Sequence, residues 1–274
     1  MTVPGELPAI SVLIRTFNSA KTLDRVLSGL ILKKDEEYIV VDSGSTDSTL
    51  DIAESRGARI VHAKGPFNYS KSLNLGFQSA CNPWVLVISS HSIPVVPDLL
   101  ALYRAIVPNF PSSLAAAYGP NSLDGSSPFD DDKVRFYLPE NYMEIYPFCG
   151  NGNTLYRRSA WEAVPFNEGI RTSEDKEWLA EIMKKGCSIA FVSGALTINL
   201  TQYPLGYMFM KGYSDQRALP HTPMTLFDFF MAWGSHTKKF LRGGMPVGNW
   251  SRYSAHIAGR FFASYQEQDN TPGK

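Results

Sequence analysis

The chain has 274 residues, 44% of them hydrophobic and 12% aromatic, and its 26 Lys and Arg balance 26 Asp and Glu. This composition argues against a disordered chain, and the zero net charge argues against a protein that binds nucleic acid through a basic surface. The three cysteines, Cys81, Cys149 and Cys187, form no Cys-x-x-Cys, so neither a disulfide framework nor a zinc site is expected. The length predicts one large or two small domains.

No segment carries the pattern of a membrane span or a signal peptide. The N-terminus lacks a basic stretch followed by an apolar one, and no stretch reaches the roughly 18 apolar residues of a span. The longest apolar region, residues 223–233, contains Asp228 and predicts a core or interfacial helix. We therefore expect a cytoplasmic protein.

The first 106 residues alternate between two patterns. Continuous β-branched runs predict strands at residues 10–14, 38–41, 59–62 and 84–88, and helical spacing of apolar residues predicts helices at 20–30, 45–56, 70–80 and 97–106. This alternation predicts βαβ units and a parallel sheet. Ligands bind beyond the carboxyl ends of such strands, which directs attention to residues 15–18, 42–47 and 89–92.

The second half is less regular. A polar loop is expected at residues 121–132, a strand within 148–156 and again at 188–192, and helices at 159–164 and 173–185. Ser45 or Asp47 is expected to cap the helix over 45–56, and Ser173 the helix over 173–185. The predicted organisation is an α/β domain over 1–204 and a helical and loop extension over 205–274 packed on it.

Acidic residues at two places in the chain are candidates for a role in binding or catalysis. Asp42 directly follows a buried strand, where its carboxylate could accept hydrogen bonds from a nucleobase or ribose, or could merely cap a helix. Glu174 and Asp175 stand together at a predicted helix start, either as ordinary capping residues or with one of them as a general base. The glycines of dinucleotide-binding and P-loop motifs are missing.

Several motifs in one order resemble the family 2 glycosyltransferases of the GT-A fold: RTFN at residues 15–18, VVDSGSTDST at 40–49, SKSLNLG at 70–76, and FCGNGNTLY at 148–156 followed by SEDKEW at 173–178. The resemblance covers about residues 8–200. It implies a central, mostly parallel sheet flanked by helices, with a nucleotide-sugar half at 8–96 and an acceptor half at 97–204. It also implies inverting transfer of a hexosyl-type sugar from a nucleotide-diphosphate sugar to a saccharide or lipid-linked hydroxyl, in surface polysaccharide or glycolipid assembly.

The resemblance further implies a role for each matching residue. Asp175 matches the catalytic base, and Glu174 and Trp178 would orient that base and the acceptor. The matching substrate-binding positions are Thr16, Phe17, Asn18 and Asp42 for the nucleoside, and Lys71, Asn74 and Ser89 beside the diphosphate and sugar. A closing C-terminal segment would add Arg217 and His221 as diphosphate contacts.

The sequence departs from the family at its metal site. Ser89-Ser90-His91 replaces the usual Asp-x-Asp, and Asn199 stands where many members carry a histidine. One hypothesis is a weak Mn²⁺ or Mg²⁺ site built from His91, the donor diphosphate and waters. The other is metal-independent transfer, in which His91, Lys71 or a later basic residue offsets the leaving charge. We favour the divalent ion; a third interpretation makes His91 a structural histidine.

Other functions compete with this interpretation. The lost carboxylates would also suit a non-catalytic partner subunit that binds sugar nucleotides, although such a protein has little reason to keep Asp175 and Trp178. A nucleotidyltransferase would need a glycine-rich basic loop, and residues 10–23 contain no glycine. After residue 205 the sequence has eight Lys and Arg but only four Asp and Glu, and several aromatic residues lie among them. This excess of positive charge suits peripheral contact with an anionic membrane. The alternative is a core helix with a solvated basic face.

Overall fold

The fold is that of a computed structural model, which describes residues 8–125, 127–170, 172–201, 204–217, 224–242 and 247–269. The chain divides into two compact units, residues 1–200 and 201–274. The packing of residues 205–274 on the first domain remains a prediction.

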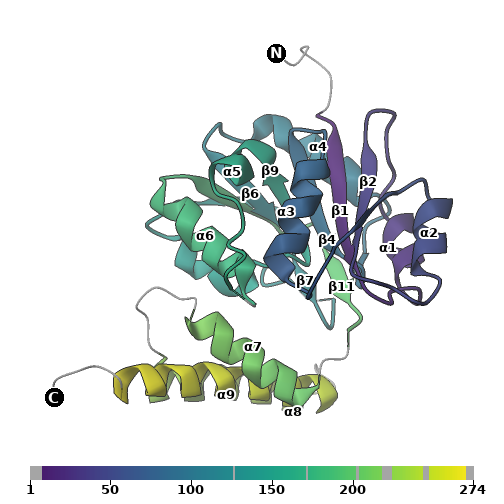
Figure 1. Ribbon diagram of the computed structural model, residues 1–274. Coiled ribbons are helices and arrows are strands. Elements are labelled where there is room, and N and C mark those ends of the chain that lie inside the picture. Colours follow the sequence, from purple (N-terminus) through teal and green to yellow (C-terminus); the bar gives the residue numbers. More distant parts are fainter. Residues whose placement is uncertain are drawn as a thin grey trace. The chain divides into compact units, whose positions relative to one another are not determined.

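An eight-stranded, mostly parallel sheet forms the centre of the first unit (Figure 1). Its order is β3-β2-β1-β4-β9-β6-β10-β8, and β9 and β8 run antiparallel to their neighbours. The strands are β1 (Ile10–Thr16), β2 (Glu37–Asp42), β3 (Arg59–His62), β4 (Trp84–Ser89), β6 (Leu114–Tyr118), β8 (Val134–Tyr137), β9 (Asn153–Arg157) and β10 (Ser188–Val192).

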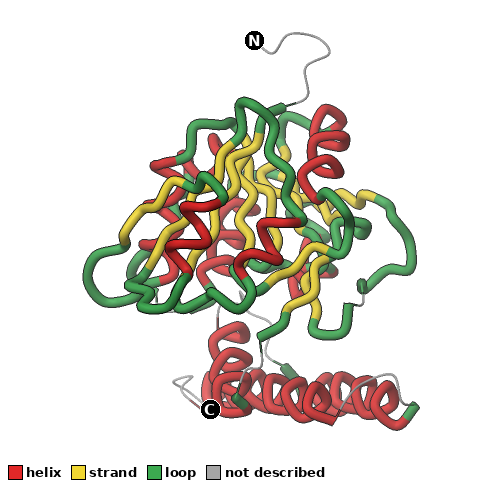
Figure 2. The backbone as a smooth tube through the Cα atoms, turned by 90° about the vertical axis from the view of Figure 1, so that its right-hand side faces the viewer, coloured by secondary structure: helices red, strands yellow, loops and turns green. Residues whose placement is uncertain are grey.

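Helices cover both faces of this sheet, which is why its central strands are apolar on both sides (Figure 2). One face packs on α1 (Leu23–Ser28), α2 (Thr49–Ser55) and α4 (Leu99–Ile106). The other lies under α3 (Tyr69–Ser79), α5 (Arg158–Ala163) and α6 (Glu174–Lys184) (Figure 1). Close approach of α3 requires Gly76, because a Cβ there would collide with Leu13 of β1.

The predicted strands are confirmed, and the helices are present with different boundaries. α1 and α2 begin at Leu23 and Thr49, later than predicted, and Ser48 rather than Ser45 or Asp47 is the N-cap of α2. The reason is tertiary: the Ser45 hydroxyl donates to Asp42 and accepts from the Asn18 amide, and Asp47 accepts from the Ala20 amide. These bonds between loops hold the preceding residues out of the helices.

A second, three-stranded sheet was not predicted. It has the order β5-β11-β7, formed by β5 (Ser92–Pro94), β11 (Thr197–Asn199) and β7 (Asn121–Ser122). β7 occupies the start of the segment that was expected to be loop. Strands of two or three residues carry too little pattern for a sequence argument, and their pairing stabilises them instead.

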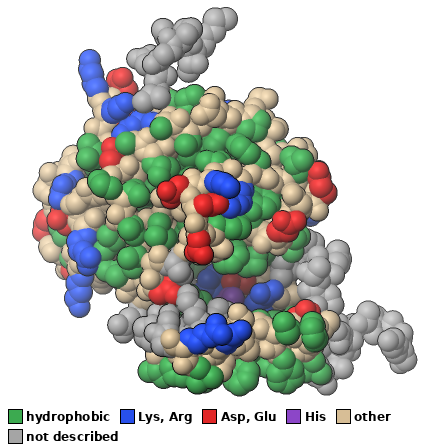
Figure 3. Space-filling model, turned by 180° about the vertical axis from the view of Figure 1, so that it is seen from behind, with side chains coloured by type: hydrophobic (Ala, Val, Ile, Leu, Met, Phe, Trp, Pro, Cys, Tyr) green, Lys and Arg blue, Asp and Glu red, His purple; other side chains and the backbone are tan. Residues whose placement is uncertain are grey.

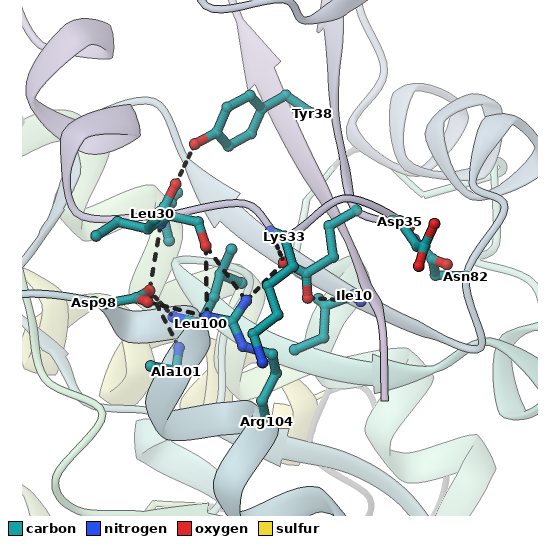
Figure 4. Close-up of polar contacts among 12 residues, drawn as sticks. Ile10, Leu30, Lys33, Asp35, Tyr38, Asn82, Asp98, Leu100, Ala101 and Arg104 are labelled. Carbon is teal, nitrogen blue, oxygen red and sulfur yellow. Dashed lines mark hydrogen bonds and ion pairs between the residues drawn. The ribbon is translucent and has the colours of Figure 1, made fainter. Parts of the chain in front are cut away.

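A buried ion cluster joins α4 to the loop between α1 and β2 (Figure 4). The Arg104 guanidinium donates to Glu36 at 2.6 Å and to Asp98 at 3.0 Å, and the Arg104 and Glu36 side chains are almost fully buried. Asp98 also caps α4 by accepting from the Leu100 and Ala101 amides. The cluster lies away from the carboxyl edge of the sheet and serves the fold.

In the second unit the described residues form the helices α7 (Leu205–Arg217), α8 (Leu226–Leu241) and α9 (Val247–Asp269). The His256 side chain on α9 lies 3.0 Å from Asp215 on α7, and the rings of Phe229 on α8 and Phe261 on α9 lie 5.1 Å apart. None of the helices among the described residues combines the length and hydropathy that a membrane span requires.

Candidate active site

Most of the predicted site residues gather where the strands of the parallel half of the sheet end. Arg15 at the end of β1 lies in register with Val41 of β2 and Ser89 of β4. The start of α6 reaches the same place, because the Arg15 guanidinium donates to Glu174 at 3.2 Å. This edge therefore joins the predicted nucleotide-binding segments to the predicted catalytic acids, as the rule for ligand sites on such sheets leads us to expect.

The Asp42 carboxylate organises the loop after β2. One oxygen accepts from the hydroxyls of Thr16 (2.8 Å) and Ser45 (2.5 Å), and the other from the amides of Gly44 and Ser45 (both 2.9 Å). Burial raises the pKa of Asp42, but these hydrogen bonds outweigh it, so the pKa lies below its usual value. Asp42 is thus an ionised and saturated acceptor, and it shapes the loop that would meet a nucleoside.

The loop after β1 presents an aromatic ring to solvent. The Phe17 side chain is 60% exposed at this edge. Asn18 supports it, since the Asn18 side-chain oxygen Oδ1 accepts from the Thr46 amide at 2.8 Å. Among the described residues other than glycine, positive φ occurs at Asn18 (49°) and at Ser173 (64°), directly before Glu174. Backbone strain of this kind gathers at functional sites.

A small pocket adjoins this edge, lined by residues 43, 63–68 and 71–72. Lys71 contributes to it with its ammonium group 3.2 Å from the Lys64 carbonyl oxygen. The Ser43 hydroxyl oxygen is buried and has no hydrogen-bond partner among the described residues. A buried hydroxyl without a partner is costly, so a ligand that bonds to Ser43 would be stabilised here.

Asn74 and Trp178 lie inside the protein. The Asn74 amide donates to Phe166 and Glu168 and accepts from the Trp161 indole (2.9 Å) and the Phe166 amide (3.0 Å). Trp178 is fully buried and donates to the Val164 carbonyl oxygen at 2.6 Å. Both side chains hold the segment between α5 and α6 in place and so support α6.

The residues after β4 supply hydroxyls and an imidazole. The Ser89 amide donates to Gly152, the Ser90 hydroxyl lies 2.8 Å from that of Ser19, and His91 is half-buried. Burial, and then the charge of Arg15, lower the pKa of His91 to about 4, so its imidazole is neutral at pH 7. A neutral imidazole can ligate a metal ion but offsets no phosphate charge.

The two acids at the start of α6 have different surroundings. The Glu174 carboxylate is buried and accepts from Arg15 and from the Asn151 side chain at 3.1 Å. Burial, and then the charge of Asp175, raise the pKa of Glu174, although Arg15 opposes this. Asp175 is half-buried, and its oxygens accept from the amides of Asn151 (3.1 Å) and Lys176 (2.8 Å). Asp175 is therefore the acid of the pair that an acceptor can reach.

Sequence reasoning assigned no role to two residues of this site. Arg15 lay within residues 15–18, to which the strand ends directed attention, and its charge at the end of an otherwise apolar strand was a signal that could have given it a role. Asn151 binds both acids through its amide and side chain, and is itself held by a 2.6 Å bond from Tyr156. Of the predicted diphosphate contacts, His221 and the side chain of Arg217 lie outside the described residues.

The side chains at this edge do not form a metal site by themselves. Among the described residues, no group of three or more His, Cys, Asp or Glu is arranged to hold an ion. Mg²⁺ and Mn²⁺ favour carboxylate oxygens, and residues 89–91 offer none. The donor set therefore does not fit a divalent ion held by the protein alone.

Comparison with known proteins decides the family. The model of glycosyl transferase family 2 matches residues 11–164, more than half of the chain. The chain belongs to glycosyl transferase family 2. This confirms the predicted resemblance, and the chain is accordingly a glycosyltransferase.

Individual relatives agree with this assignment. A Mycobacterium bovis (strain BCG / Pasteur 1173P2) protein named PGL/p-HBAD biosynthesis glycosyltransferase is 32% identical over 182 residues, which are 61% of this chain and 67% of that protein. The Pyrobaculum calidifontis mannosyltransferase PcManGT, solved with GDP-Man and Mn²⁺, is similar with a TM-score of 0.62 at 13% identity over 99% of this chain and 77% of its own. S. aureus TarS with UDP-GlcNAc has a TM-score of 0.61 at 15% identity, over 96% and 93%. These likenesses confirm the predicted GT-A fold.

Proposed function

We propose that this family 2 glycosyltransferase moves a hexosyl-type sugar, with inversion, from a nucleotide-diphosphate sugar to an acceptor hydroxyl. The observation that carries the proposal is the placement of Asp175: half-buried, held by the amides of Asn151 and Lys176, beside the edge where β1, β2 and β4 end. A carboxylate so held can take the proton of a hydroxyl as that oxygen attacks the anomeric carbon.

The difference between the two acids supports inversion. Glu174 is buried and committed to Arg15 and Asn151, which leaves Asp175 as the acid of this pair that can meet substrate. One accessible base activates the acceptor for a single in-line displacement, in which the bond to the diphosphate oxygen breaks and the configuration inverts. Thr16, Asn18 and Asp42 would shape the nucleoside site, Phe17 would stack on the base, and Lys71 and Ser89 would lie beside the diphosphate and sugar.

The acceptor is proposed to be a saccharide or lipid-linked hydroxyl, in surface polysaccharide or glycolipid assembly. The mycobacterial relative is named for the biosynthesis of PGL, which supports a glycolipid. PcManGT was solved with Mn²⁺, whereas residues 89–91 here carry no carboxylate. The Mn²⁺ requirement stays a prediction that binding experiments test.

Calorimetric titration with UDP, GDP and dTDP, each with and without Mn²⁺, tests the proposal. We expect one of the three to bind at micromolar concentration, and the matching nucleoside to bind at least tenfold more weakly. Affinity that depends on Mn²⁺ and is lost in His91→Ala would establish a metal site at His91. If none of the three nucleotides binds, the proposed donor site is wrong. If one binds but no sugar is transferred, the result favours the alternative of a non-catalytic partner subunit.

We further propose that the chain is cytoplasmic and touches the inner face of the membrane through α8. Five large apolar side chains of α8 are between 59% and 75% exposed: Leu226, Phe227, Phe230, Met231 and Leu241. Hydrophobic side chains are visible on the surface of the second unit (Figure 3). Lys238 and Arg242 are exposed in the last turn, and Asp228 caps the first. An apolar stripe with a basic end suits an anionic lipid surface.

Co-sedimentation of the full chain with phosphatidylglycerol-containing and pure phosphatidylcholine vesicles tests this surface. We expect binding to the anionic vesicles, weakened by salt, and at least a tenfold loss in the double variant Phe227→Ser/Phe230→Ser, since each buried Phe contributes about 1.5–3 kcal/mol. Val95→Ser, an exposed apolar residue of the first unit, is the control. No binding to either vesicle, or a concentration-dependent dimer that the double variant abolishes, would overturn the membrane proposal.

A further inference from the structure

We propose that Arg15 is the resident cation of the donor site and binds the diphosphate of the sugar nucleotide. The inference rests on the proposed function and deepens it. It assigns to a side chain of β1 the charge that an Asp-x-Asp-bound metal ion would otherwise bring, and it makes Glu174 the positioning partner of Arg15.

The position of Arg15 is the first argument. It is the penultimate residue of β1, a central strand, and pairs in register with Val41 and Ser89. The carboxyl ends of β1, β2 and β4 surround it, where parallel sheets bind their ligands. Thr16, the next residue, turns to Asp42, while Arg15 turns to Tyr69 and Glu174. The guanidinium therefore stands between the predicted nucleoside loop and the predicted catalytic acids.

The way Arg15 is held is the second argument. Its side chain is only 15% exposed; one Nη donates to Glu174, and the guanidinium lies 4.9 Å from the centre of the Tyr69 ring. Within the described part of the chain, the other guanidinium nitrogens form no hydrogen bond. A guanidinium has five N–H donors in a planar fork, so most of them remain for a ligand. A fork held on two sides is preorganised for bidentate contact with phosphate oxygens.

Charge is the third argument. A diphosphate brings at least two negative charges to this edge, and residues 89–91 provide no carboxylate to hold a compensating divalent ion. A guanidinium group carries a permanent positive charge in proteins. Before the donor arrives, Glu174 balances this buried charge, since an unpaired buried cation would be strongly destabilising. The diphosphate oxygens of the donor would then bind the same guanidinium. Donor binding and the position of Glu174 are linked, because both depend on Arg15.

Calorimetry on the full chain tests the inference, with the nucleoside diphosphate that wild type binds and its nucleoside as probes. In Arg15→Gln without metal, we expect the diphosphate to bind about 10-fold to 100-fold more weakly, because a hydrogen bond to a charged group contributes about 1.5–3 kcal/mol. Nucleoside affinity should stay within twofold of wild type. Arg15→Lys keeps a positive charge but not the planar fork of donors, so its diphosphate affinity should fall by less, about threefold to tenfold.

Two further variants separate binding from structural support. Glu174→Gln breaks the ion pair but leaves the guanidinium, so diphosphate affinity should be kept or raised. Arg56→Gln, in an exposed pair with Asp24, should bind like wild type. Diphosphate affinity within twofold of wild type in Arg15→Gln, or equal losses in Arg15→Gln and Glu174→Gln, would overturn the inference. If the Arg15→Gln variant does not fold, Arg15→Lys tests the inference instead, and its diphosphate affinity should be at least threefold weaker than that of wild type. Wild type that binds no nucleotide would instead overturn the proposed function itself.

Discussion

Asp175→Asn is expected to lower kcat by about 10²-fold to 10⁴-fold, the usual contribution of a positioned general base. Asn keeps the size of the side chain and one oxygen to accept from the Asn151 amide, but it cannot take a proton. Donor affinity should therefore stay within about twofold of wild type. The measurement is nucleoside diphosphate release from the sugar nucleotide identified by titration, with alkyl glycosides as acceptors, alongside calorimetry of the donor.

Glu181→Gln is the matched control for this experiment. Glu181 lies on the same helix, is half-buried, and pairs with Lys184 one turn later. We expect this variant to keep wild-type kcat, because Glu181 lies nearly two turns along α6 from Asp175 and its side chain pairs with Lys184. Retention of more than a tenth of the wild-type kcat in Asp175→Asn would rule out Asp175 as the base. A parallel loss in Glu181→Gln would point to α6 as a whole and not to one carboxylate.

Arg104→Met is expected to lower the free energy of unfolding by about 3–5 kcal/mol. The loss arises because Glu36 would remain buried without its cation, at a carboxylate that also accepts from the Ile10 and Lys33 amides (Figure 4). Urea denaturation followed by circular dichroism measures it. Adding Glu36→Gln to Arg104→Met should restore part of the stability, because the uncompensated charge is then gone.

An exposed ion pair provides the contrast. Arg56 donates to Asp24 at the surface, so Arg56→Met should change the free energy of unfolding by no more than about 1 kcal/mol. Equal effects of the Arg56 and Arg104 variants would mean that burial does not decide the contribution of these pairs. A loss below about 1 kcal/mol in Arg104→Met would show that Glu36 finds other compensation.

Periodicity predicted the strands and helices of the first 106 residues well, since each buried strand is a continuous apolar run and each helix has one apolar face. It predicted the helix starts less well. The hydrogen bonds that the amides of Thr46 and Ala20 donate to Asn18 and Asp47 connect two loops more than 25 residues apart, and no local pattern contains them. β5, β7 and β11 were missed for a similar reason, because partners far along the chain stabilise these short strands.

The sequence by itself determined the α/β architecture, the family, and the edge of the sheet at which chemistry occurs. It determined that edge because parallel strands place their carboxyl ends at the same side of a sheet, whatever the loops do. Only the tertiary structure decided which polar side chains at that edge remain available. Asn74 is wholly occupied by the segment before α6, whereas Asp175 stays accessible. The pair of Arg15 and Glu174 joins residues 159 positions apart, and only the tertiary fold, which brings the start of α6 to the end of β1, creates it.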